Sequence, residues 1–222
     1  MTDAHTHVEA QDSICILAEP CIGEARFIGF HPWYLESFDI KSLRNRLTAN
    51  PCLGVGEIGL DRLRDRNISS AMRDAFAAQL SLAAEFHRPV VLHGAKCWGE
   101  VVKGCMSYKG IIPSFLFHGF SRSAGLVPDI VSLNGFISIG PAILNDHAVN
   151  YREMVQSLPE DIILVETDAT IENAASRPHL RDIVKALSDV RGVSLDAMSA
   201  ILERNVDRMF APITASGDSR PL

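Results

Sequence analysis

Six histidine and carboxylate side chains stand at or beside the ends of short apolar runs in this sequence of 222 residues. They are His5, His7, Glu57, His93, His118 and Asp168. Imidazole and carboxylate groups suit Zn, Mn, Fe and Ni ions better than they suit Ca. Two such ions held close together lower the pKa of water and stabilise the attacking and leaving oxygens of a hydrolysis. The residue types therefore predict a metal-dependent hydrolase, if the fold brings the six side chains together.

The position of these residues carries more weight than their types. His5 and His7 are two residues apart at the end of a short strand, so their side chains project from the same face. A single histidine at a strand end is more often a hydrogen-bonded structural residue than a metal ligand. Six histidines and carboxylates in such positions instead indicate a common site. Glu57 ends Cys-Leu-Gly-Val-Gly-Glu, His93 ends Pro-Val-Val-Leu-His, His118 ends Ser-Phe-Leu-Phe-His, and Asp168 follows Ile-Leu-Val-Glu-Thr.

Short apolar runs alternate with longer segments of helical spacing, which is typical of βα units. Several runs are almost wholly apolar, as expected of parallel strands covered on both faces. The pattern predicts an α/β fold, a TIM-type (β/α)8 barrel, whose strands bring their carboxyl ends to one catalytic face. The predicted strands are residues 2–5, 13–18, 26–30, 52–57, 89–93, 114–118, 135–140 and 162–166, and the predicted helices are residues 38–49, 70–87, 97–107, 123–133, 147–157, 178–191 and 194–210.

The start of the chain departs from the regular barrel pattern. Only five residues separate His7 from Ser13, whereas a crossover between parallel strands needs about a dozen. The first crossover helix is therefore missing, and we expect residues 13–18 to be either an antiparallel addition or no barrel strand at all. The barrel is expected to be irregular or incomplete near the N-terminus.

Composition and charge limit the class of protein. With 47% hydrophobic and 22% charged residues, the chain has the composition of a soluble globular protein. We expect residues 1–211 to form a single domain and the polar residues 212–222 to form a flexible tail. The 27 acidic residues outnumber the 21 lysines and arginines, for a net charge of −6. This balance disfavours broad electrostatic attachment to nucleic acid and leaves room only for a local phosphate site.

Targeting signals and disulfides are not indicated. The sequence contains no apolar run of roughly 18 residues or more, and its first residues lack the basic and apolar regions of a secretory signal peptide. The five cysteines include no Cys-x-x-Cys pair, which favours reduced, packed thiols. We therefore expect a cytoplasmic protein without membrane contact.

Motifs in order along nearly the whole chain resemble the TatD-type metal-dependent hydrolases, a family of the amidohydrolase-like superfamily that includes DNases. The resemblance implies two divalent ions, of Zn, Mn, Mg, Fe or Ni. It implies His5, His7 and Asp168 as ligands of one ion, His93 and His118 as ligands of the other, and Glu57 as the bridge. Asp168 would also take the proton from the attacking water, so Glu57 and Asp168 are the catalytic candidates. The motifs are Asp3-Ala4-His5-Thr6-His7, Gly29-Phe30-His31-Pro32, Gly56-Glu57-Ile58-Gly59-Leu60-Asp61, Pro89-Val90-Val91-Leu92-His93, His118-Gly119-Phe120-Ser121, Glu166-Thr167-Asp168 and Asn205.

The residues around these motifs depart from the family pattern. Ala95 stands where the family usually has Arg, and Lys96 follows it; Arg122 replaces a usual Gly and Thr170 a usual Pro. The family normally also has a helix and a strand after the His-x-His motif, so the chain resembles a short, divergent member. The candidate substrate contacts are His31, Lys96 and Arg122, of which the two cations could equally be solvated surface charges.

Three further residues lie beside the motifs. Ligating imidazoles usually donate their second N–H to a carboxylate or carbonyl, so we expect Asp61 to orient a ligand histidine or the loop after Glu57. Trp33 and Trp98 could stack on a base or ring, or pack over the mouth of the barrel.

The predicted activity is hydrolysis by metal-activated water. By resemblance the enzyme is a phosphodiesterase or deoxyribonuclease, which acts on nucleic acid or a small phosphodiester. The same ligand set can serve an amidohydrolase or phosphoesterase on a small molecule, an alternative that the acidic charge and the missing Arg favour. A non-catalytic metal-binding relative is disfavoured because no ligand is missing. No protein partner can be inferred from the sequence.

Overall fold

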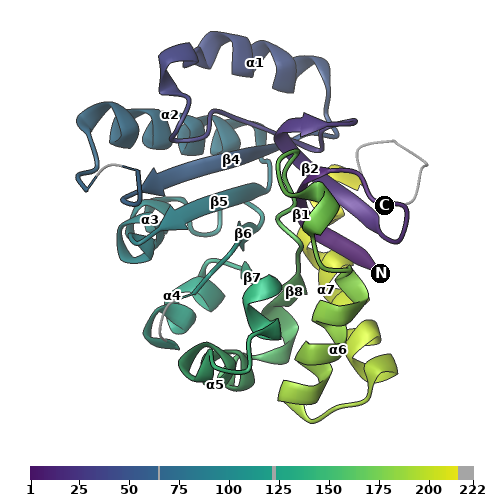
Figure 1. Ribbon diagram of the computed structural model, residues 1–222. Coiled ribbons are helices and arrows are strands. Elements are labelled where there is room, and N and C mark those ends of the chain that lie inside the picture. The colour runs from purple at the N-terminus through teal and green to yellow at the C-terminus, as the bar shows by residue number, and fades with distance from the viewer. Residues whose placement is uncertain (65, 122–123, 215–222) are drawn as a thin grey trace.

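The computed structural model describes residues 1–64, 66–121 and 124–214, and it is a barrel of parallel strands with helices around its outside (Figure 1). The strands follow one another around the sheet in chain order, from β1 to β8, and every neighbouring pair is parallel. This arrangement confirms the predicted (β/α)8 barrel.

The predicted alternation of strands and helices is present. No helix of the described residues is long and apolar enough to cross a lipid bilayer. The strands are β1 (Thr2–Val8), β2 (Ile14–Ile22), β3 (Phe27–Ile28), β4 (Gly54–Asp61), β5 (Val90–Ala95), β6 (Phe115–Phe117), β7 (Gly135–Ile139) and β8 (Ile163–Val165), and the α-helices are α1 (Ile40–Ala49), α2 (Ser70–Phe86), α3 (Trp98–Cys105), α4 (Val127–Ser132), α5 (Val149–Ser157), α6 (Leu180–Arg191) and α7 (Leu195–Thr214).

Strand β2 corrects one prediction. It runs parallel to β1, with Thr2 opposite Ile14 and Val8 opposite Ile22, and it pairs with β3 on its other side. Residues 13–18 are therefore neither an antiparallel addition nor outside the barrel, although the described connection between β1 and β2 does lack a helix. The connection includes a turn at residues 11–12 and a bend at Ser13. A short, irregular connection replaces the longer helical crossover.

Contacts between β1 and the residues just after β8 close the barrel. The backbone N–H and the hydroxyl of Thr167 donate to the buried carboxylate of Asp3, at 3.0 and 2.5 Å. The N–H of Asp168 donates to the carbonyl of His5 at 3.2 Å, and the N–H of His7 donates to a carbonyl of the same segment at 2.8 Å. These bonds bring Asp168 next to the two histidines of β1.

Helix α7 packs into the core inside the barrel. Its residues Met209, Phe210 and Ile213 are buried in one cluster with residues from most of the strands, and the ring centroid of Phe210 lies 5.8 Å from that of Phe27. Because the burial of Ile213 stabilises a further helical turn, residues 212–214 belong to α7 and not to the expected tail. The rest of that predicted tail, 215–222, lies outside the described residues.

Candidate metal centre

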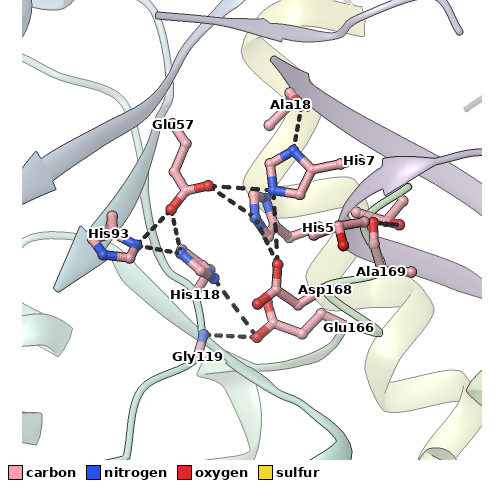
Figure 2. Close-up of polar contacts among 12 residues, drawn as sticks. His5, His7, Ala18, Glu57, His93, His118, Gly119, Glu166, Asp168 and Ala169 are labelled. Carbon is pink, nitrogen blue, oxygen red and sulfur yellow. Dashed lines mark hydrogen bonds and ion pairs between the residues drawn. The ribbon is translucent and has the colours of Figure 1, made fainter. Parts of the chain in front are cut away.

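The six predicted side chains meet around Glu57 (Figure 2). They come from β1, β4, β5 and the segments that follow β6 and β8. Glu57 lies between the two histidines of β1 on one side and His93 and His118 on the other. Glu57 and His118 are buried, whereas 44% of the Asp168 side chain is exposed. The site is therefore closed to solvent around Glu57 and His118 and is accessible to solvent at Asp168.

His5, His7 and Asp168 form what we name the Asp168 half of the site. Nε2 of His5 lies 3.4 Å from Glu57 Oε2 and 3.6 Å from Asp168 Oδ1. Nε2 of His7 lies 3.5 and 3.7 Å from the same two oxygens. Ligand atoms about 2.1 Å from one tetrahedral ion stand about 3.4 Å apart. The ligand atoms of His5, His7 and Glu57 all lie within 4.8 Å of one another. Together with the similar distances from both rings to Asp168, this spacing fits a divalent cation between the histidines and the carboxylates.

The hydrogen bonding of the two β1 histidines agrees with that fit. Both ring nitrogens of His5 are buried and have no hydrogen-bond partner among the described residues, a cost of about 1–3 kcal/mol that a metal bond would remove. Nδ1 of His7 lies 2.8 Å from the carbonyl oxygen of Ala18 in β2. Since that oxygen only accepts, Nδ1 donates and Nε2 is left to face the carboxylates. Strand β2 thus sets the orientation of His7.

His93 and His118 form what we name the His93 half. Glu57 Oε1 lies 2.7 Å from Nδ1 of His93 and 2.6 Å from Nε2 of His118. Burial raises the pKa of Glu57, but the charge and hydrogen bond of His118 outweigh it and hold that pKa well below its usual value. Burial lowers the pKa of His118, yet Glu57 raises it well above the ordinary range. An ionised carboxylate between basic rings marks a place for positive charge.

A buried carboxylate holds the ring of His93. Asp61 Oδ2 accepts from Nε2 of His93 at 2.8 Å and from the indole N–H of Trp33 at 2.9 Å. Asp61 Oδ1 accepts from the backbone N–H groups of Leu63 and Arg64 at 2.5 and 3.0 Å. Burial raises the pKa of Asp61, but these hydrogen bonds lower it below its usual value. Asp61 both directs Nδ1 of His93 to Glu57 and orders the loop after β4, as expected from the sequence.

Glu166 is a further buried carboxylate, for which no role was predicted from the sequence. It is 1% exposed and accepts from the N–H of Gly119 at 2.7 Å and from the hydroxyl of Ser138 at 2.5 Å. Its Oε1 lies 3.9 Å from Nδ1 of His118 (Figure 2). Glu166 therefore orders the segment that carries His118. An acidic residue two positions before Asp168 at the end of a buried strand is the signal that could have found it.

Asp3 supports the other half in the same way, and it too has no assigned role in the sequence analysis. Its carboxylate is fully buried, and burial raises its pKa to about 7 against the hydrogen bonds from Thr167. Since Thr167 precedes Asp168, the Asp3 contact fixes the start of the segment that carries Asp168.

A cleft of about 300 Å³ opens beside Glu57. It reaches His7, His31 and Glu57, and its walls are residues 20–21 of β2, residues 33–34 after β3 and residues 170–172 after β8. The end of β2 and the loops after β3 and β8 therefore define the space in which a substrate meets the site.

The predicted substrate contacts lie in different places. His31 belongs to the centre itself, because its Nε2 lies 3.4 Å from Glu57 Oε1 while its Nδ1 accepts from the N–H of Trp33 at 3.1 Å. Lys96 is exposed after β5 and is not among the described residues that line the cleft. Arg122 lies outside the described residues.

Comparisons with known proteins agree with this geometry. The model of the family described as TatD related DNase matches residues 6–211. The 3′-5′ ssDNA/RNA exonuclease TatD of Dickeya dadantii is 26% identical over 226 residues, covering 93% of this chain and 84% of that protein. The uncharacterized metal-dependent hydrolase YabD of Bacillus subtilis is 22% identical over 198 residues, covering 82% of this chain and 76% of that protein.

Solved structures show the same fold. The crystal structure of YjjV, a TatD homologue from Escherichia coli, matches with a TM-score of 0.78 at 22% identity, covering 95% of this chain and 98% of that chain. The family model spans nearly the whole sequence and includes the motifs that carry the resemblance, except Asp3, Ala4 and His5 of the first one. The chain therefore belongs to the TatD-related DNase family of metal-dependent hydrolases.

Proposed function

We propose that this chain is a phosphodiesterase that hydrolyses nucleic acid with two divalent ions. The observation that carries the proposal is the sharing of Glu57. Its Oε2 faces the Asp168 half at 3.4 and 3.5 Å from the two β1 histidines, and its Oε1 faces the His93 half at 2.6 and 2.7 Å. A carboxylate shared by two ligand groups can hold two ions close together, as two-metal hydrolysis needs.

Each half would hold one ion, with His5, His7 and Asp168 on one side and His93 and His118 on the other. Divalent ions there would supply positive charge to the phosphodiester oxygens and lower the pKa of the attacking water. Zn, Mn, Mg, Fe and Ni are the candidate ions.

Asp168 is the group proposed to accept the proton of the attacking water. It is the most exposed member of the set, with 44% of its side chain accessible, so its carboxylate faces both the β1 histidines and solvent. Its backbone is left-handed, with φ of 47°, and the bond from its N–H to the carbonyl of His5 holds that conformation. A carboxylate within hydrogen-bond reach of the water acts as the general base.

Nucleic acid is the proposed substrate because of the family and its relatives. The family is described as DNases, and the Dickeya relative is named a 3′-5′ ssDNA/RNA exonuclease. We infer that residues 1–211 act as one hydrolase domain. The second candidate is a hydrolase of a small phosphoester or amide. It is favoured by the cleft, whose described lining contains Glu172 and no lysine or arginine.

The first test is metal content combined with an Asp168→Asn variant. We expect about two ions per chain in protein purified without chelator. Turnover of bis(p-nitrophenyl) phosphate should fall by about 10²–10⁴-fold in Asp168→Asn, because the general base is lost. Asp146→Asn changes an acid that is 87% exposed on the surface and serves as the matched control. Absence of bound metal under every loading condition would overturn the proposal.

A second measurement separates the two substrate classes. Single-stranded DNA should be cleaved, and its binding should weaken as salt rises, because phosphate contacts release counterions. Intact DNA together with cleavage of a small phosphoester or amide would select the second candidate.

A further inference from the structure

Large apolar side chains stand exposed around the cleft beside Glu57. Trp33 is 39% exposed and Tyr34 is 44% exposed, both from the segment after β3. Ile171, from the loop after β8, is 65% exposed and lines the same cleft. Apolar surface gathered in a concave site, next to convergent polar groups, is characteristic of ligand binding.

The Trp33 ring is held in place before any ligand arrives. Its indole N–H donates to Asp61 at 2.9 Å, and its backbone N–H donates to Nδ1 of His31 at 3.1 Å. Its carbonyl accepts from the guanidinium of Arg64 at 3.1 Å. A ring that is already ordered loses little conformational entropy when a ligand packs against it.

The charges that line the cleft disfavour a second phosphate. Apart from Glu57 and the site histidines, the charged group in its described lining is Glu172, and a phosphate placed between these walls would be repelled by that carboxylate. The guanidinium of Arg64 lies outside this lining, 6.0 Å from the centre of the Trp33 ring, where it binds the Trp33 carbonyl. A planar, uncharged ring would instead contact aromatic and aliphatic faces, which bind any nucleobase without regard to its sequence.

We propose that this cleft binds a nucleobase of the substrate, beside the phosphodiester that reaches Glu57, through contacts with Trp33, Tyr34 and Ile171. The inference rests on the proposed function, since it takes the scissile phosphate to lie at the metal centre. The substrate would then be recognised through the nucleobase next to the cleaved bond. Such recognition needs few basic side chains, which is consistent with the net charge of −6.

Tryptophan fluorescence tests the binding of the ring directly. The chain has two tryptophans, and Trp98 is 3% exposed with its ring 5.4 Å from that of Phe120. Trp98 therefore packs in the core, and a ligand-dependent change reports on Trp33. Adenosine 5′-monophosphate should quench the fluorescence of the metal-loaded protein saturably, and ribose 5-phosphate should not.

Variants then test which side chains hold the ring. Tyr34→Ala and Ile171→Ala should each weaken adenosine 5′-monophosphate binding about tenfold, the size of a lost base-stacking contact. Val149→Ala removes a side chain of similar exposure, 57%, from α5 and should leave binding unchanged. Equal affinity for adenosine 5′-monophosphate and ribose 5-phosphate, or unchanged affinity in both cleft variants, would overturn the inference.

Kinetics with two small phosphodiesters separate this inference from the proposed function. The holoenzyme should cleave thymidine 5′-(p-nitrophenyl phosphate) with a higher kcat/KM than methyl p-nitrophenyl phosphate, and Ile171→Ala should lower that ratio about tenfold. Equal rates on the two esters would reject the base site and leave the hydrolase standing. Failure to cleave either ester with any divalent ion would reject the proposed function, while the quenching still decides whether the cleft binds a ring.

Discussion

The two halves of the site are held by different parts of the barrel. The His93 half stands on β4, β5 and β6, which α2 and α3 connect, and Asp61 locks one of its rings. The Asp168 half stands on β1 and on the segment after β8, beside the short β1–β2 connection that lacks a helix. Hydrogen bonds across the closure of the barrel hold it instead. Backbone and side-chain bonds can therefore place metal ligands where a packed crossover is missing.

The halves also differ in how ready they are for a cation. In the His93 half both rings lie within 2.7 Å of Glu57 Oε1, so an ion entering there must replace existing hydrogen bonds. In the Asp168 half the four facing atoms keep separations of 3.4 to 3.7 Å, because the closure bonds hold β1 and Asp168 in place. We therefore expect the Asp168 half to bind its ion more tightly than the His93 half.

Glu57→Gln should have the largest effect, because it removes the charge that the two halves share. The neutral amide leaves five imidazoles facing one another without their central anion, those of His5, His7, His31, His93 and His118. We expect kcat/KM to fall by about a thousandfold or more, which corresponds to several kcal/mol of lost transition-state stabilisation. Metal content should fall in both halves. Glu153→Gln on the exposed side of α5 is the matched control, and two ions still bound to Glu57→Gln would contradict the shared role.

Asp61→Asn should break the His93 half alone. The amide nitrogen of Asn cannot accept, so the variant loses part of the set of four bonds that fixes His93 and the loop after β4. We expect one of two metal affinities to fall by about 10–100-fold, as for other groups that orient a ligand. The other affinity should stay unchanged. Calorimetric titration with Mn or Zn measures both.

Trp33→Phe tests the same half of the site more narrowly, since it removes only the hydrogen bond from the indole N–H to Asp61. It should lower the metal affinity of the His93 half by a small part of the loss expected for Asp61→Asn. Equal weakening of both ions by either variant would show that the two halves are not supported separately.

The six candidate ligands could be predicted from the sequence because their placement depends on a local feature, the end of an apolar strand. In a parallel barrel such ends meet whatever the loops do. The role of Asp61 followed from the same logic, because a ligand imidazole needs a second partner. The parallel pairing of β2 could not be predicted, since its connection to β1 has no helix and is much shorter than the usual parallel crossover.

Other features depend on which distant segments pack together. Asp3 and Glu166 are buried carboxylates whose hydrogen-bond partners lie far along the chain, as in the bond between Asp3 and Thr167. Trp33 and Trp98 both follow strand-end motifs, yet one is 39% and the other 3% exposed. Local pattern does not distinguish these cases, because tertiary packing decides burial.

The smallest expected effect tests how the short β1–β2 connection is held. Asp12, within that connection, accepts from His179 Nδ1 and from Arg177 Nη2, both at 2.8 Å. These two bonds lower the pKa of Asp12 to about 2. Because this folded-state pKa lies below the ordinary value of about 3.9, the stabilisation is present above about pH 4 and is lost as the pH falls toward 2.

Asp12→Asn should therefore lower the free energy of unfolding at pH 7 by less than about 1 kcal/mol, because the 38% exposed carboxylate is screened by solvent. Urea denaturation measures the difference from the wild type, which should shrink as the pH falls from about 4 toward 2. Asp146→Asn, in the more exposed pair with Arg152, should show a smaller change or none. If Asp12→Asn is as stable as the wild type at pH 7, the link from Asp12 to the segment after β8 is not needed. The hydrogen bonds between β1 and β2 would then be enough to hold the connection and, with it, the Asp168 half.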